Sequence, residues 1–386
     1  MNRPRDTLSP AEAAATPWDV VVVGAGPAGA LAARGLARRG ARVLLVDRAH
    51  FPRAKVCGAC LGPRGLAVLR DEGLAAPPAP ATPLAAVRLL CAGRALELPL
   101  PPMVAVARED LDSALVAAAA EAGAELLLGT RAEACPEPDG PLRSLLLHGA
   151  SGTTRVTARV IVAADGLAGR LLGGAAPRAT PRSRVGAGVL LAEAPAALPA
   201  GRLLMAAGRA GYVGLVRLPD ARLDVAAALD PRAVAAAGGA GRLMAELLER
   251  AGGPRLPELG AADVRLTPPL TRRAARPAGH RLLAVGDAAG FVEPFTGEGL
   301  SWALLSGRAV VPLALEGVRR WDERLARAWA QSHRAEVVRH QRLCRLLAAW
   351  LRHPLLVRAG LALAARRPAL AHGLLARLGA PPAVAP

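Results

Sequence analysis

The chain has 386 residues, of which 52% are hydrophobic and 2% aromatic, and its net charge is +18. This apolar content can fill buried cores and excludes a disordered chain. No uninterrupted apolar run reaches the roughly 18 residues of a spanning helix, so an integral membrane protein is not expected. The chain starts without the apolar core of a signal peptide, and we expect residues 1–17 to be the disordered lead of a cytoplasmic protein.

The basic excess could favour nucleic acid, a membrane surface or acidic ligands. Aromatic residues are too sparse for a base-stacking surface, so we expect no nucleic-acid partner. Half of the net charge lies between Gly317 and Arg367, where twelve arginines accompany three acids. Basic amphipathic helices there would suit peripheral contact with an anionic membrane. Solvated helices with an apolar stripe toward the core would explain the same composition.

The first predicted unit is a strand, a helix and a second strand. Val20–Val23 is a short apolar run typical of a buried parallel strand. Ala28–Arg39 has helical periodicity and ends at Gly40. Ala41–Val46 is a second buried strand that ends at Asp47. This order predicts a minimal βαβ crossover.

The rest of the chain mixes strands and helices without an internal repeat. His50–Gly65 is predicted to be a loop, and Leu84–Leu100 a hairpin. Alternating runs from Ser183 to Leu229 predict an antiparallel sheet. Everything after Trp321 is predicted helical, with breaks at Pro354 and Pro368. Further helices are predicted at Arg108–Ala122, Ala233–Arg250 and Leu300–Leu315, and further strands at Glu125–Leu128, Ser144–Leu147, Arg155–Ala163 and Arg281–Val285.

These elements predict an α/β fold in which one domain is interrupted by an inserted sheet. The expected divisions are a lead at 1–17, a first domain made of 18–83, 107–182 and 276–318, an inserted domain made of 84–106 and 183–275, and basic C-terminal helices at 319–386.

The strongest local signal is the glycine run between the first strand and the first helix. Gly24 permits a tight turn, Gly26 lets the backbone approach a pyrophosphate, and Gly29 lets helix and strand pack closely. Free N–H groups at the helix start then hold phosphates. Asp47 follows Gly26 by 21 residues, where a carboxylate can bind ribose hydroxyls. The predicted dinucleotide contacts are Gly24, Gly26, Pro27, Ala28, Gly29, Asp47 and Arg48. This motif alone does not separate FAD from NAD, and Arg48 could equally suit a 2′-phosphate.

A second motif follows the strand predicted at 281–285. Gly286 and Asp287 are followed by Pro294, Gly297, Glu298 and Gly299. With the glycine run, these residues resemble the flavoprotein superfamily that contains geranylgeranyl reductases, aromatic-ring hydroxylases and flavin-dependent halogenases. The resemblance implies that Asp287 binds the ribityl chain of FAD and that the glycines lie close to the isoalloxazine. A helix starting near Leu300 would direct its positive end at the flavin and stabilise negative charge there.

Two further stretches resemble the same superfamily. Asp165, in an Asp-Gly pair after a predicted strand, resembles a motif near the pyrophosphate, although a structural turn would explain it too. Arg108 starts a predicted helix and resembles an arginine that approaches FAD, although a surface helix start would look alike. Both residues are therefore candidate cofactor contacts.

The segment from Phe51 to Gly58 resembles the geranylgeranyl-reductase branch, where a Cys-Gly pair lies over flavin and substrate. This implies cofactor contacts from Arg53, Lys55 and Cys57, with Cys57 and Gly58 as catalytic candidates. Cys57 and Cys60 could also form a redox dithiol. No second pair follows, so no metal site is expected.

One stretch departs from that branch. Its members carry a Tyr-x-Trp-x-Phe-Pro run, whereas Gly211–Val216 of this chain has the tyrosine alone. Tyr212 is a third catalytic candidate, which would face the substrate, although core packing would also explain it. The departure puts polyprenyl reduction itself in doubt.

The resemblance implies a Rossmann-like FAD-binding domain of the GR2/PHBH type, an inserted antiparallel β-sheet substrate domain and a helical C-terminus. We expect an FAD-dependent oxidoreductase that uses NAD(P)H as a transient reductant, or else a ferredoxin-like donor. It would reduce a C=C bond or hydroxylate a hydrophobic isoprenoid, polyketide or aromatic molecule. The alternatives are a membrane-surface flavoprotein that passes electrons to quinone, and a flavin-binding protein without turnover.

Overall fold

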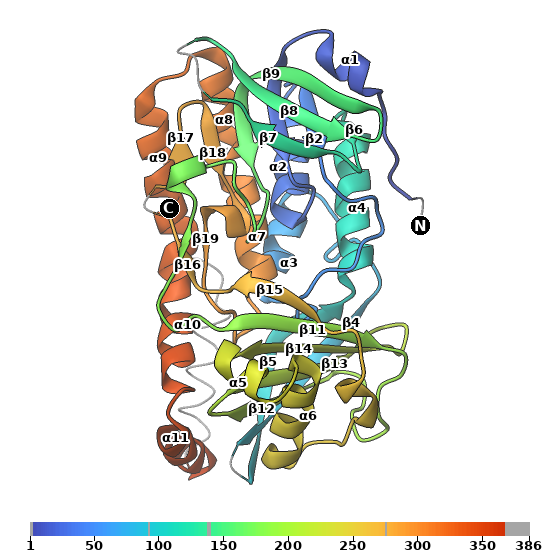
Figure 1. Ribbon diagram of the computed structural model, residues 1–386, viewed down its shortest axis with the longest axis vertical. Coiled ribbons are helices and arrows are strands. Elements are labelled where there is room, and N and C mark those ends of the chain that lie inside the picture. The colour runs from blue at the N-terminus through green and yellow to red at the C-terminus, as the bar shows by residue number, and fades with distance from the viewer. Residues whose placement is uncertain (1–2, 92, 137–139, 275, 367–386) are drawn as a thin grey trace.

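The computed structural model describes residues 3–91, 93–136, 140–274 and 276–366 (Figure 1). Two large sheets stand one above the other in this view, and helices near the C-terminus run along one side of both. The upper sheet is built from strands of the predicted segments 18–83, 107–182 and 276–318. The lower sheet is built mostly from 84–106 and 183–275, with β3 (Cys60–Leu61) and the start of β4 (Ala81–Cys91) added from the segment 18–83.

A parallel sheet forms the centre of the upper part. Its strands lie in the order β18 (Leu282–Ala284), β9 (Gly152–Ala163), β1 (Trp18–Val23), β2 (Val43–Val46) and β6 (Glu125–Leu127). Val22 of β1 pairs with Leu45 on one side and with Val162 on the other. Antiparallel strands β17 (Ala278–Gly279), β8 (Arg143–Gly149) and β7 (Arg131–Ala134) extend the sheet.

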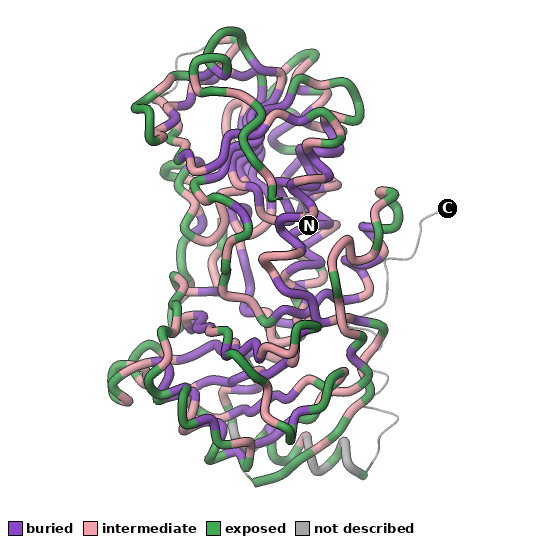
Figure 2. The backbone as a smooth tube through the Cα atoms, turned by 90° about the vertical axis from the view of Figure 1, so that its right-hand side faces the viewer, coloured by how far each residue is buried: buried purple, intermediate pink, exposed green. Residues whose placement is uncertain are grey.

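Both faces of this sheet are covered, which explains its nearly continuous apolar strands. One face packs on helices, including α2 (Pro27–Ala37), α4 (Arg108–Glu121), α7 (Gly299–Ala309) and α8 (Val311–Arg319). The other face packs on side chains of the long β8–β9 hairpin and on Ala13 of α1 (Pro10–Ala14). Figure 2 shows buried backbone through the middle of the upper part and again across the lower part.

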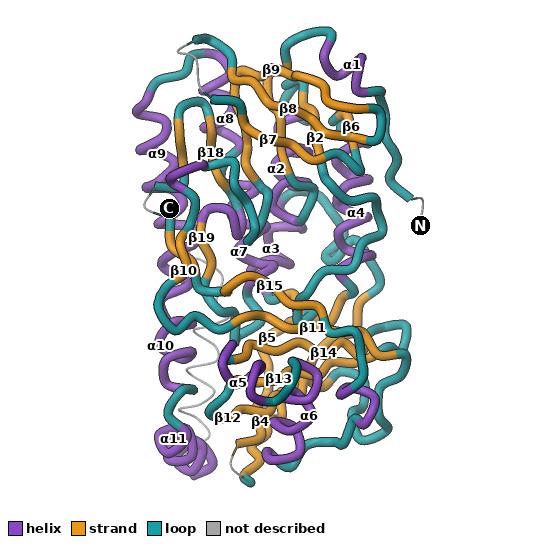
Figure 3. The backbone as a smooth tube through the Cα atoms, viewed as in Figure 1, coloured by secondary structure: helices purple, strands orange, loops and turns teal. Residues whose placement is uncertain are grey.

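The lower sheet is the inserted antiparallel sheet. Its order is β15 (Arg265–Pro269), β11 (Val185–Leu191), β14 (Leu223–Leu229), β13 (Gly211–Arg217), β12 (Arg202–Gly208), β4 (Ala81–Cys91), β5 (Arg94–Val106) and β3 (Cys60–Leu61). Only the β12–β4 pair along this order is parallel. Helices α5 (Pro231–Ala236) and α6 (Ala240–Ala251) lie on the side away from the upper domain (Figure 3). The opposite face is therefore turned toward the glycine loop.

The C-terminal helices are α9 (Glu323–His333), α10 (Arg339–Trp350) and α11 (Pro354–Arg366), with a π-helical turn at Arg334–Val338. Trp329, Val337 and Cys344 are buried in the main core, so these helices are partly structural. None of the helices in the described parts of the chain is long and apolar enough to span a bilayer. Part of the predicted division at 319–386, including Pro368, lies outside the described residues. The remaining elements are α3 (Pro63–Asp71), β10 (Arg178–Ala179), β16 (Arg272–Arg273), β19 (Gly290–Phe291), and 3-10 turns at Gly173–Ala175, Pro257–Gly260 and Gly286–Ala289.

The start of the chain differs from the expected disordered lead. Helix α1 begins after Ser9, whose hydroxyl and the Glu12 carboxylate form a reciprocal capping box. The Trp18 indole N–H donates to the carbonyl of Ala13, which is fully buried. These local contacts order a polar segment that composition alone describes as a tail.

Three other predicted elements differ in detail. The loop predicted at His50–Gly65 ends early, because Pro63 starts helix α3. The helix predicted at Ala233–Arg250 is broken by Gly238 and Gly239, which both adopt positive φ. The helix predicted at Leu300–Leu315 is divided into α7 and α8 around residue 310. Proline at the second position of α8 explains the break, because it cannot donate a helical hydrogen bond.

Candidate functional site

The glycine loop between β1 and α2 has no room for side chains at two positions. An ideal Cβ on Gly24, whose φ is +104°, would lie 2.2 Å from the carbonyl oxygen of Ala164. A Cβ on Gly29 would lie 1.8 Å from the carbonyl oxygen of Gly24. Gly26 differs, because its Cβ would meet only the Arg53 guanidinium, at 3.5 Å. The loop is therefore tight against the protein and open at Gly26, as a phosphate-binding turn requires.

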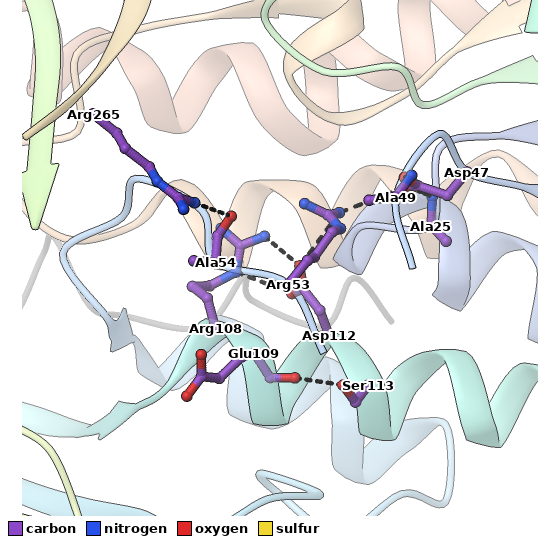
Figure 4. A network of polar contacts seen from close by, with 10 residues as sticks. All are labelled: Ala25, Asp47, Ala49, Arg53, Ala54, Arg108, Glu109, Asp112, Ser113 and Arg265. Carbon is purple, nitrogen blue, oxygen red and sulfur yellow. Dashed lines mark hydrogen bonds and ion pairs between the residues drawn. The ribbon is translucent and has the colours of Figure 1, made fainter. Parts of the chain in front are cut away.

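Asp47 connects the end of β2 to this loop. Its Oδ2 accepts a hydrogen bond of 2.7 Å from the Ala25 N–H, and its Oδ1 accepts one of 2.9 Å from the Ala49 N–H (Figure 4). The Arg53 guanidinium lies 3.7 Å from the same carboxylate. These contacts hold the glycine loop in place, and the binding of ribose by Asp47 stays a prediction.

A second carboxylate organises the two arginines predicted to approach the cofactor. Asp112 of α4 is fully buried and accepts two hydrogen bonds from Arg108, of 3.0 and 2.8 Å. Arg53 lies 3.4 Å from Asp112, so it bridges Asp47 and Asp112 (Figure 4). Burial alone would lower the pKa of Arg108, but the adjacent Asp112 carboxylate raises it overall. Arg108 is therefore a fixed positive charge at the cavity wall.

A cavity of about 440 Å³ lies between the glycine loop and the lower sheet. Many residues singled out in the sequence line it, namely Gly26, Pro27, Ala28, Gly29, Arg48, Lys55, Cys57, Gly58, Arg108, Asp165, Tyr212, Gly286, Asp287, Pro294, Gly297 and Gly299. Gly24, Asp47, Arg53 and Glu298 lie outside this lining. The cavity thus joins most of the separate sequence motifs.

The early and late motifs meet at Gly286. An ideal Cβ on Gly286, whose φ is +58°, would lie 3.0 Å from the Cβ of Ala28 in α2. The Gly286 N–H donates a 2.7 Å hydrogen bond to the Ser306 hydroxyl of α7. Burial raises the pKa of the adjacent Asp287 carboxyl, while Lys55 and Arg108 oppose that shift. Asp287 and Gly26 line the same cavity.

Lys55 is the only lysine of the chain and reaches this cavity from the loop after β2. It keeps solvent access through the cavity, yet the surrounding protein lowers the pKa of its ammonium. Arg108 lowers this pKa further, and Asp287 opposes the shift.

Two residues predicted to contact the cofactor, Asp165 and Glu298, form polar contacts with other groups of the protein. The Asp165 carboxylate accepts hydrogen bonds from the N–H groups of Arg170 and Leu171, at 2.7 and 3.1 Å, so it stabilises its own turn. Glu298 is buried and lies 3.5 Å from Arg64. Burial raises the pKa of Glu298 to about 7 despite Arg64. The carboxylate of Glu298 is thus turned away from the cavity, while its neighbours Gly297 and Gly299 face it.

Cys57 and Cys60 are free thiols that both line the cavity. Burial raises the pKa of each, so both are neutral near pH 7. Within the described ranges, no group of three or more His, Cys, Asp or Glu residues could hold a metal ion.

Tyr212 lies at the cavity wall beside a buried ion pair that the sequence did not reveal. Its ring packs edge-on against Phe295 with centroids 5.0 Å apart, and the Arg184 guanidinium lies 5.7 Å from the ring centre. Arg184 and Glu293 are 2% and 1% exposed and form a 2.8 Å ion pair. Burial raises the pKa of the Tyr212 phenol, and the negative charge of Glu293 raises it further. The one hint of this ion pair in the sequence is Glu293, an acidic residue in an otherwise apolar stretch between Val292 and Pro294.

The remaining wall is the apolar face of the lower sheet. Leu203, Met205, Gly214, Val216 and Ala226 contribute to it. Gly214 and Val216 lie in the stretch where the resembling branch carries its Tyr-x-Trp-x-Phe-Pro run. The arrangement places a polar dinucleotide slot beside a wide apolar chamber.

A family model described as an FAD binding domain matches residues 17–189. A menaquinone reductase from Mycolicibacterium smegmatis is 31% identical over 325 residues, covering 78% of this chain and 76% of that protein. The chain therefore belongs to the family of FAD-binding reductases that contains this menaquinone reductase. A digeranylgeranylglycerophospholipid reductase 1 from Methanopyrus kandleri is 29% identical, covering 79% of this chain and 82% of that protein.

Solved structures share the fold. The flavin-dependent brominase Bmp2 superposes with a TM-score of 0.75 at 19% identity, covering 94% of both chains. The p-nitrophenol 4-monooxygenase PnpA from Pseudomonas putida gives 0.76 at 17% identity, covering 93% of this chain and 96% of that one. The predicted fold class and the assignment as an FAD-dependent oxidoreductase are confirmed.

The residues of this chain fit FAD. Gly24 and Gly29 form a cradle that any Cβ would fill, Gly26 opens from it into the cavity, and Asp287 lines the same cavity from the late motif. The two motifs are close enough for one extended ligand to bridge them, as the Gly286–Ala28 approach indicates.

Proposed function

We propose that this protein is a reductase of a hydrophobic isoprenoid or prenylated quinone. The observation that carries the proposal is the shared cavity, in which the dinucleotide slot opens directly onto the apolar face of the lower sheet. Two relatives are named for the reduction of a menaquinone and of a digeranylgeranyl lipid, which supports this substrate class.

The parts of the cavity have separate tasks in this proposal. The N-terminus of α2 and Gly26 hold the pyrophosphate, Arg48 and Asp47 lie at the adenosine end, and Asp287 accepts ribityl hydroxyls. FAD supplies the two-electron redox chemistry when it is bound. The N-terminus of α7, which begins at Gly299, places its positive end at the cavity and favours negative charge there.

The remaining residues select and orient the substrate. Cys57, Gly58 and Tyr212 face the apolar chamber, and the raised pKa values of the thiol and the phenol keep both groups neutral. Neutral donors suit a chamber that takes an uncharged chain, because an unpaired charge there would be costly.

The electron donor is proposed to be NAD(P)H that binds transiently. The described part of the chain contains one glycine-rich dinucleotide loop, so the donor would approach the open side of the cavity. Anaerobic mixing of the holoprotein with NADPH should bleach the flavin absorbance. Subsequent addition of a short-chain menaquinone should restore it without oxygen. The proposal would be contradicted if neither NADH nor NADPH reduces the flavin, or if the quinone does not reoxidise it.

Hydroxylation is the second candidate, favoured by the fold shared with PnpA. Admission of O2 to the reduced protein separates the two. A hydroxylase forms a new C–O bond in an aromatic substrate, whereas a reductase yields a product with two added hydrogens in the absence of O2.

Contact with a membrane surface is a further part of the proposal. Leu346 and Leu356 are 68% and 54% exposed on α10 and α11, which are rich in arginine. Flotation with vesicles containing anionic lipids should retain the full chain, and L346Q/L356Q should weaken that retention. Because Trp329 and Val337 belong to the core, these two exposed positions are better probes than deletion of the helices.

A further inference from the structure

The apolar face of the lower sheet carries one buried acid. Asp224 begins the row on β14 that continues, two residues apart, with Ala226 and Ala228 at the cavity. Its neighbours across the sheet are Val216 of β13 and Leu190 of β11. Asp224 is 9% exposed, and its Oδ2 atom has no hydrogen-bond partner in the described part of the chain. An acid on such a face is costly unless it serves a purpose there.

A small hollow lies beside Asp224 and shares lining residues with the reaction cavity. Its volume is about 20 Å³, and Lys55, Arg108, Glu109 and Asp224 line it. Lys55 and Arg108 also line the large cavity, so the two spaces share a wall. The wall of the small hollow is mixed, with Lys55, Arg108, Glu109 and Asp224 beside alanines and leucines. A space of this size can hold one water molecule, since about 10–15 Å³ is enough, and these four side chains offer it polar partners.

Among the residues that the structure describes, no basic side chain forms an ion pair or hydrogen bond with Asp224. Arg108 forms its hydrogen bonds with Asp112, and Arg222 forms its ion pairs with Asp220 and Glu109. Burial therefore raises the pKa of Asp224 to about 8, with Arg108 and Arg222 opposing only in part. The other titratable groups facing this region are Lys55, Cys57 and Cys60, and both thiols are neutral near pH 7.

Glu109 forms the outer side of the hollow. Its side chain is 25% exposed and pairs with Arg222, which is 29% exposed. Glu109 thus reaches solvent, Asp224 is buried, and Lys55 faces the reaction cavity. All three residues line the same hollow, and Lys55 lines the reaction cavity as well.

We propose that Asp224 is a proton-relay residue, which passes protons from the Glu109 side through a water in the hollow to Lys55 at the reaction cavity. The proposal rests on the proposed reductase function. Reduction of a double bond takes up one hydride, which the cofactor supplies, and one proton, which an acidic side chain beside the cavity can supply. Asp224 gives up one proton and regains one from solvent, so it is unchanged after each turnover.

The variant that tests the relay is Asp224→Asn, which keeps the shape and removes the exchangeable acid. Its FAD content and its anaerobic reduction by dithionite should match the wild type. Reoxidation by a short-chain menaquinone should slow by about a hundredfold. The wild-type rate should fall as the pH rises through about 8, whereas the variant should lack this fall.

Asp220→Asn is the matched control on the same hairpin, because Asp220 contacts Arg222 outside the hollow. Its pH profile should follow the wild type, and Asp224→Glu should restore part of the lost rate. A second readout does not depend on turnover. Infrared spectra of protein with isotope-labelled aspartate should contain a protonated carboxyl band below about pH 8 that Asp224→Asn lacks.

The outcomes separate the two proposals. An Asp224→Asn variant with the wild-type rate and pH profile, or spectra without that carboxyl band, would overturn the relay alone. Wild-type flavin that no prenylated quinone reoxidises would overturn the proposed reductase and the relay with it.

Discussion

Gly286 and Ala28 approach so closely that a Cβ on the glycine would lie 3.0 Å from that of the alanine. One residue belongs to the late Gly-Asp motif and the other to the helix after the glycine loop, 258 positions earlier. The contact places Asp287 and Gly26 on one cavity. The two halves of the FAD site are therefore assembled by the packing of α7 and the 3-10 turn on α2.

The glycine loop predicts a large difference between two alanine substitutions. Gly24→Ala should lower the free energy of unfolding by roughly 2 kcal/mol or more, because the Cβ meets a carbonyl oxygen at 2.2 Å in left-handed backbone. Gly40→Ala is the control, since its φ is +80° but nothing lies within 4 Å. Its cost should be about 1 kcal/mol. Urea denaturation measures both, and equal costs would contradict the close-approach argument.

Glu298 predicts a pH dependence of stability. Its pKa is raised from 4.5 to about 7 in the folded state, so folding favours the protonated carboxyl. The stability that this protonated carboxyl contributes is fully present below pH 4.5 and is lost as the pH rises through 7. The wild type should therefore lose roughly 3 kcal/mol across this range relative to Glu298→Gln. Urea denaturation at several pH values measures the difference. If the free energies of unfolding of the wild type and Glu298→Gln differ by the same amount at every pH, then folding does not raise the pKa of Glu298.

The ion pair behind Tyr212 predicts unequal effects of two conservative changes. Glu293→Gln leaves Arg184 buried beside a neutral partner and should cost about 3 kcal/mol of stability. Tyr212→Phe keeps the ring contacts with Phe295 and should cost about 1 kcal/mol. Thermal denaturation of the apoproteins compares them. If Tyr212→Phe lowers the stability more than Glu293→Gln does, the ion pair does not make the largest contribution to the stability of this cluster.

Most of the strand and helix order could be predicted from the sequence, because the glycine loop, β1, β2 and α4 are encoded by local patterns. The Arg184–Glu293 pair could not, since its partners lie 109 positions apart and neither belongs to a motif. The orientation of Asp165 and Glu298 was also beyond local reasoning. A motif identifies the segment, but only tertiary packing decides that Arg64 draws the Glu298 carboxylate away from the cavity.

The apolar chamber predicts a size limit. Gly214 faces it, and a Cβ there would lie 2.9 Å from the Met205 sulfur, which is flexible. Gly214→Trp should leave FAD bound, because the dinucleotide slot lies elsewhere in the cavity. It should raise KM for a long prenylated quinone by about tenfold and affect menadione less. Steady-state kinetics with both quinones test this, and equal losses would place the substrate outside the chamber.

The central claim is that the glycine loop and Asp287 hold one FAD. Flavin content after denaturation of the purified or reconstituted protein tests it most directly, with Gly26→Asp as the matched variant. We expect about one FAD per wild-type chain. We expect almost none in Gly26→Asp, because a carboxylate would occupy the phosphate position. Protein that is colourless and cannot be reconstituted, or Gly26→Asp that retains one FAD per chain, would contradict the account.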